Sequence, residues 1–199
     1  NAQDFKTPVD YLNYIGKETE IISRTTWKYT TTVAHTKNAR RIDATRKSLV
    51  KSIQNATKKI EALKDGYKGD VEYKNQLLAY LSISEKHINE EYDKIIDMQE
   101  VAEQSYDYME AYIMTRDLVN AKINEEVDKL NANQKIFANK YNIQIGEDDS
   151  ELGKKMKISN EVFENLTQLY LILFKVNFTE SVLLKAIESN DISAIQQNS

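Results

Sequence analysis

The chain lacks cysteine altogether and has one proline, five glycines and two histidines among 199 residues. Without cysteine it has no disulfide, no thiolate metal site and no cysteine nucleophile. Because proline and glycine interrupt helices, their scarcity predicts long unbroken helical segments. A carboxylate-bundle metal site needs Glu-x-x-His motifs, but the residues three positions before His35 and His87 are Thr32 and Ser84. We therefore expect no metal and no cofactor.

Catalytic motifs are also missing from the sequence. Neither histidine has a serine in a nucleophile elbow as its partner. The turn at 65–70 lacks the spacing and the Lys-Ser/Thr ending of a phosphate-binding loop. The acidic run at 147–151 (EDDSE) has its glycine before the run, whereas a calcium loop has it inside. We expect no catalytic residue and interpret the protein as a non-enzyme. The alternative is an enzyme for which Arg116 and the carboxylates near it are the only candidate residues.

The charges are unevenly distributed, although the net charge of −4 by itself implies no partner. Residues 1–68 carry 14 Lys and Arg against 7 Asp and Glu, and the remainder carries 13 against 24. One interpretation is that the basic part packs beside the acidic helices and the charges balance within the molecule. The other is a basic face that meets an anionic surface, with nucleic acid disfavoured because aromatic residues are not interleaved with the cations. The cations of that face would be Arg40, Arg41, Arg46, Lys47, Lys51, Lys58 and Lys59.

Helix signals divide the first third of the chain. Residues 1–7 form a lead-in, after which Thr7 is expected to cap a helix with Pro8 at its first position. Apolar residues then follow helical spacing, but their phase shifts near 34–39, which predicts a turn or kink. The turn at 66–70 is a clearer break, with Gly66 expected as a helix C-terminal cap and Asp70 as the next N-cap.

The rest of the chain reads as two further helical regions. From 70 to 142 one heptad phase is kept, which predicts one long helix or two that continue each other. We favour a break at 99–107 and keep 120–124 as the alternative. An acidic loop follows at 142–157, then a last helix from Ser159 to about Glu188, and a polar tail at 190–199.

The stretch 166–178 (LTQLYLILFKVNF) is apolar around nearly its whole circumference. A helix of this kind is normally buried against several partners, and it is too short to span a bilayer. We therefore predict an all-α fold, an elongated antiparallel helical bundle of four or five long helices. Its last helix, at about 159–188, would be central and most buried. The length suits one domain over 1–199.

One place favours a ligand pocket. Tyr106, Tyr108 and Tyr112 cluster with acidic residues, and Arg116 follows at a heptad core position. Tyrosine rings offer apolar bodies with polar ends, as small-molecule pockets often require. The alternative is that these are boundary residues, with Arg116 reaching water along its stem.

The stretch 102–112 (AEQSYDYMEAY), with 137–143 (FANKYNI) and 150–152 (SEL), resembles a family of exported helical proteins of Bacteroidetes-type bacteria that has no known chemistry. The resemblance implies export and assigns no functional residue. The chain starts Asn1-Ala2-Gln3 without Met, which we interpret as the end left when a signal peptide was removed, with trimming as the alternative. A lipid anchor upstream is compatible with either interpretation.

Taken together, these features predict an exported, non-enzymatic helical protein of the periplasm or cell surface. It would act by protein–protein interaction or envelope assembly, with an unknown protein partner or as a homo-oligomer. The alternative is a small-ligand-binding bundle whose pocket is lined by the tyrosines near Arg116.

Overall fold

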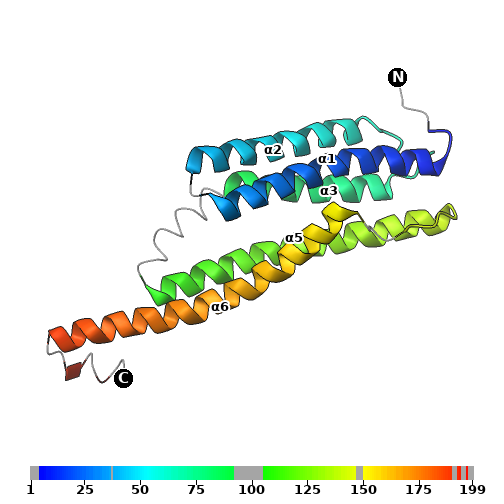
Figure 1. Cartoon of the computed structure of the whole chain (residues 1–199). Helices are drawn as coiled ribbons and strands as arrows, with labels where there is room; N and C mark the ends of the chain where they lie inside the picture. Colours follow the sequence, from blue (N-terminus) through cyan, green and yellow to red (C-terminus); the bar gives the residue numbers. More distant parts are fainter. Residues whose placement is uncertain are drawn as a thin grey trace. The chain divides into compact units, whose positions relative to one another are not determined.

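The computed structural model describes residues 5–36, 38–91, 105–146, 150–189, 192, 193 and 196, with some helical side chains left out (Figure 1). Within these ranges it contains no strand, only an isolated bridge between Tyr67 and Asp70. The prediction of an all-α protein is confirmed. The helices are α1 (Pro8–His35), α2 (Ala39–Glu61), α3 (Glu72–Lys86), the π-helix η1 (His87–Glu91), α5 (Tyr106–Lys140) and α6 (Glu151–Glu188).

The chain divides into two compact units. Unit 1 comprises Asn1–Tyr92 and Val119–Asp148, and unit 2 comprises Asp93–Leu118 and Asp149–Ser199. Unit 1 therefore holds α1, α2, α3, η1 and the C-terminal part of α5. Unit 2 holds α6 and the N-terminal part of α5. That the whole chain is a single domain stays a prediction.

The first two helices begin where the sequence predicts. The Thr7 side chain accepts a hydrogen bond from Asp10 N at 3.1 Å, and Asp10 Oδ2 accepts from Thr7 N at 3.0 Å. This is a capping box with proline at the start of the helix. The predicted break at 34–39 is confirmed, since α1 ends at His35 and α2 begins at Ala39, capped by Asn38.

The two cap assignments at the turn between α2 and α3 are wrong. Helix α2 ends at Glu61 with Ala62 as its cap, and Val71 precedes α3 without a side-chain cap. Gly66 instead lies inside a tight turn with φ +57°, where a Cβ would collide with the Asp70 carbonyl oxygen. The Asp70 carboxylate faces another helix and does not cap α3.

The structure limits where the segment 70–142 is broken. Residues 92–104, which include most of the favoured break at 99–107, lie outside the described residues. Helix α5 begins at Tyr106, where Ser105 Oγ accepts from Tyr108 N at 3.2 Å. The alternative break at 120–124 is wrong, because α5 runs through those residues without interruption.

Helix α6 starts earlier than predicted. It begins at Glu151 and not near Ser159, so the loop is shorter than 142–157. Ser150 caps the helix by accepting a hydrogen bond from Gly153 N at 3.0 Å. Gly153 therefore sits in the first turn, where the cap satisfies its N–H group, and it does not end the helix. The predicted end at Glu188 is confirmed, whereas most of the tail at 190–199 lies outside the described residues.

An aromatic cluster forms the core of unit 1 at the ends of α1 and α5. Phe137 of α5 is 2% exposed, and its ring centroid lies 5.3 Å from that of Tyr11 and 4.6 Å from that of Tyr141. Tyr67 and Tyr73 also contact Phe137, at 6.0 and 6.2 Å. Aliphatic side chains extend the core along the helices, and the fully buried ones are Ile15, Leu49, Ile53, Ile60, Leu77 and Leu81.

Candidate interaction surface

Among the described side chains of α6, those that contact α5 are Phe174 and Lys175. Phe174 contacts the buried Met109 and Ile113 of α5. Phe178, one turn further, stacks on Phe174 with ring centroids 6.0 Å apart. Lys175 Nζ lies 5.2 Å from the Tyr106 ring centroid, a cation–π contact between the same two helices.

The expectation that the last helix is the most buried is wrong for its described residues. On α6, eight aliphatic residues remain 50–61% exposed, whereas Ala186 is buried. An all-round apolar helix needs several partners, and the described side chains of α6 that contact α5 are Phe174 and Lys175. Side chains at 163–168, 170 and 171 lie outside the description. We name the exposed set the outer face of α6: Ile158, Val162, Leu169, Ile172, Leu173, Val176, Leu184 and Ile187.

The residues of the outer face lie on one side of α6 because they follow helical spacing. Successive members are mostly three, four or seven positions apart, which places them in a stripe about 120° wide at 3.6 residues per turn. From Ile158 to Ile187 the stripe is about 44 Å long at 1.5 Å per residue. Glu180, which is exposed, interrupts it between Val176 and Leu184.

The described residues of the predicted tyrosine pocket do not come together. Tyr106 is half-buried beneath Lys175, whereas Tyr108 is 56% exposed. The two rings leave opposite sides of α5, because residues two apart on a helix differ by about 200°. The side chains of Tyr112 and Arg116 lie outside the described residues.

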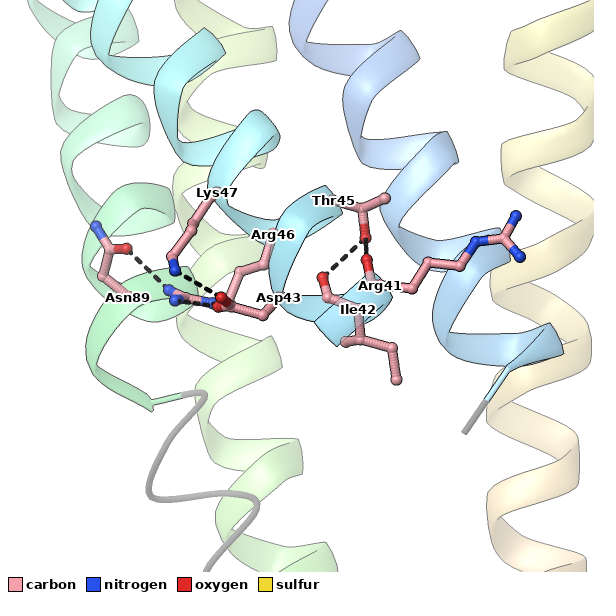
Figure 2. Close-up of polar contacts among 7 residues, drawn as sticks. All are labelled: Arg41, Ile42, Asp43, Thr45, Arg46, Lys47 and Asn89. Atoms are coloured by element: carbon pink, nitrogen blue, oxygen red, sulfur yellow. Dashed lines mark hydrogen bonds and ion pairs between the residues drawn. The ribbon is translucent and has the colours of Figure 1, made fainter. Parts of the chain in front are cut away.

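The predicted basic face is partly neutralised inside unit 1. Figure 2 shows Arg46 and Lys47 converging on Asp43, while Arg41 extends away from them. Arg46 Nη2 lies 2.7 Å from Asp43 Oδ1, and Lys47 Nζ lies 2.6 Å from Oδ2. Hydrogen bonds from Lys47 and Arg46 hold the Asp43 pKa below its usual value. Arg46 also donates to Asn89 Oδ1 of η1 at 3.2 Å.

A third cation of that face pairs with α1. Lys59 Nζ donates to both carboxylate oxygens of Glu18, at 2.8 and 2.9 Å, and this pairing raises the Lys59 pKa. Arg40, Lys51 and Lys58 are exposed. Three of the seven predicted cations therefore pair with two carboxylates, Asp43 of α2 and Glu18 of α1.

The least expected polar group is Asp70, whose side chain is 8% exposed. It accepts hydrogen bonds from Lys140 Nζ at 2.7 Å and from the Tyr141 hydroxyl at 3.3 Å. Asp70 raises the pKa of Lys140. Burial raises the pKa of Tyr11, whose buried hydroxyl has no hydrogen-bond partner among the described residues. The hydrogen bonds from Lys140 and Tyr141 to Asp70 hold the C-terminal end of α5 against the turn between α2 and α3. No sequence signal links these residues, which are about seventy positions apart.

Among the described residues, no group of three or more His, Asp or Glu side chains is arranged to hold a metal ion. None of the described helices is long and apolar enough to cross a membrane. Comparison with protein-family models, curated proteins and solved structures finds no match. The outer face of α6 is thus the most extensive feature from which a function can be argued.

Proposed function

We propose that this protein is a non-enzymatic, exported helical protein of the cell envelope that acts by binding another protein chain through the outer face of α6. The observation that supports this proposal is that eight aliphatic side chains on one helix are at least half exposed. Monomeric proteins rarely expose contiguous apolar patches beyond a few hundred Å², and larger patches mark contact sites.

The spacing of the outer face defines the chemistry of its partner. Apolar residues at intervals of three and four form ridges that interdigitate with the same ridges of a second helix. A partner helix about 40 Å long with one apolar side would cover the stripe. The small-ligand alternative has weaker support, because Tyr108 points to solvent and Tyr106 is already in contact with Lys175.

Export is supported by the resemblance of 102–112, 137–143 and 150–152 to exported helical proteins. Fractionation of the source cells, followed by protease treatment of intact cells, tests it. Recovery with the periplasm or the cell surface is expected. Recovery with the cytoplasmic fraction would refute the proposed location in the cell envelope.

Native mass spectrometry of the protein isolated from its own source tests the binding function. We expect a complex heavier than the 23.0 kDa chain. The variant Leu173→Glu should lose this complex, because a carboxylate would be placed in an apolar contact. A bare monomer for the wild-type protein would refute the proposal, and a bound small mass would favour the ligand-binding alternative.

A further inference from the structure

We propose that the partner is a second copy of this chain. Two α6 helices pack antiparallel through their outer faces, related by a two-fold axis that passes between Ile172 and Leu173. The inference deepens the proposed function and rests on it.

The outer face is complementary to itself in this arrangement. A two-fold interface needs one patch that fits its own copy when the helix direction is reversed. About an axis between Ile172 and Leu173, seven of the eight outer-face positions on one helix meet an aliphatic position on the other, and Leu184 meets Glu161. The opposed pairs within the outer face are Ile158 with Ile187, Leu169 with Val176, and Ile172 with Leu173. Val162 meets Leu183, which is half-buried and therefore not a member of the outer face as defined above.

The size of the face agrees with the requirement of a stable dimer. Eight aliphatic residues at 50–61% exposure leave an apolar surface on the order of 800 Å² uncovered, which is close to what each partner contributes to a standard interface. One helix of about 44 Å supplies the whole of this area. A second α6, which has the same length and spacing, covers it from end to end.

Glu180 selects the antiparallel direction. In a parallel pair each residue faces its own copy, so two Glu180 carboxylates would meet inside the apolar stripe, where like charges repel and are poorly solvated. In the antiparallel pair the two Glu180 residues lie about 22 Å apart along the axis, which exceeds the screening length of about 8 Å at physiological salt. The repulsion is then largely removed.

The first test is the mass of the full chain in solution, measured by sedimentation velocity at concentrations up to about 100 µM, above the micromolar range in which weak interfaces of this size dissociate. The wild type should sediment at twice the 23.0 kDa of the chain. Leu173→Glu should weaken the dimer by at least about 100-fold, because two charges enter one apolar contact. It should keep its circular dichroism, since Leu173 is 60% exposed in the single chain.

Ser181→Glu is the matched control. It adds the same charge to the same helix at an exposed position outside the stripe, and it should leave the dimer intact. If Ser181→Glu dissociates the dimer as strongly as Leu173→Glu, general charge repulsion accounts for the effect and the proposed interface is overturned.

The second test determines the direction, and the absence of native cysteine makes it direct. Under mild oxidation, Ile172→Cys should form a disulfide with its own copy, because the two positions lie about 1.5 Å apart along the axis. Val162→Cys should not, because its copy lies about 32 Å away. A mixture of Val162→Cys and Leu183→Cys chains should cross-link to each other. Ser181→Cys is the unreactive control.

The outcomes separate this inference from the proposed function. Self-linking of Val162→Cys indicates a parallel pair and overturns the antiparallel inference. A purified monomer overturns the dimer altogether. If native mass spectrometry still finds the chain from its own source bound to a different protein, the proposed function survives, whereas a monomer in both experiments removes both.

Discussion

Replacing Phe137 by alanine should destabilise unit 1 far more than the same truncation one residue earlier. Phe137 is 2% exposed and contacts the rings of Tyr11, Tyr67, Tyr73 and Tyr141. Truncating a buried phenylalanine removes its transfer free energy and leaves a cavity, which together cost about 3–5 kcal/mol. Because the aromatic contacts join α5 to α1, α3 and the turn, several elements lose packing at once.

Ile136 supplies the matched comparison, since it precedes Phe137 on the same helix and is 56% exposed. Ile136→Ala should change the free energy of unfolding by about 0.5 kcal/mol or less. The assay is urea unfolding followed by the fluorescence of Trp27, the single tryptophan, which lies on α1 in unit 1. With a slope of about 2 kcal/mol per M, Phe137→Ala should lower the midpoint by roughly 2 M.

Two outcomes of this comparison would contradict the packing described for Phe137. Equal losses for Phe137→Ala and Ile136→Ala would show that α5 does not pack with the Phe137 side inward. A loss below about 1 kcal/mol for Phe137→Ala would show that the aromatic cluster is not the core of unit 1.

Three further predictions concern turns and titrating groups. Gly66→Ala should lower the free energy of unfolding by about 1–3 kcal/mol, because it places a Cβ against the Asp70 carbonyl at positive φ. Gly16→Ala, in open space on α1, should raise the free energy of unfolding by about 0.5–1 kcal/mol in the same urea assay. Burial raises the pKa of Tyr73 to about 12. Because the unfolded chain ionises near pH 10, stability should be complete below pH 10 and fall by about 2–3 kcal/mol by pH 12; Tyr73→Phe should remove this part of the slope, and an unchanged slope would contradict the burial. The lowered Asp43 pKa means that its stabilisation is present above the ordinary carboxyl pKa and is lost as pH falls. Asp43→Asn should therefore be less stable than wild type at pH 7 and equal to it in acid, as measured by thermal unfolding.

The local signals in the sequence predicted helix boundaries well where the cap and the helix are neighbours in the chain. Thr7, Asp10 and Pro8 act within one turn, so their pattern was sufficient to place the start of α1. Asp70 looked like an N-cap by the same logic, but its carboxylate accepts from Lys140 and Tyr141, about seventy positions later. Gly153 suggested a loop, yet the Ser150 cap accommodates it in the first turn of α6.

The sequence shows the apolar residues of the candidate surface, but it does not show that they are exposed. The sequence shows that 166–178 is apolar on nearly all sides, and this distribution predicts burial. A helical pattern gives the angle of each side chain around its own axis and does not give the number of neighbouring helices. For the tyrosine pocket, proximity in the sequence does not bring Tyr106 and Tyr108 together, because side chains two residues apart project from opposite sides of α5. With the side chains of Tyr112 and Arg116 outside the described residues, the pocket stays a prediction.

The sequence by itself determined the all-α class, the absence of cysteine chemistry, the break between α1 and α2, and the end of α6 at Glu188, because these depend on composition and on contacts within a few turns. Only the tertiary structure decided that Phe137 and the tyrosines form the core of unit 1, that Asp70 binds α5, and that one side of α6 is left exposed. Those outcomes depend on which helices meet, and packing between distant segments leaves no trace in the local pattern of either one.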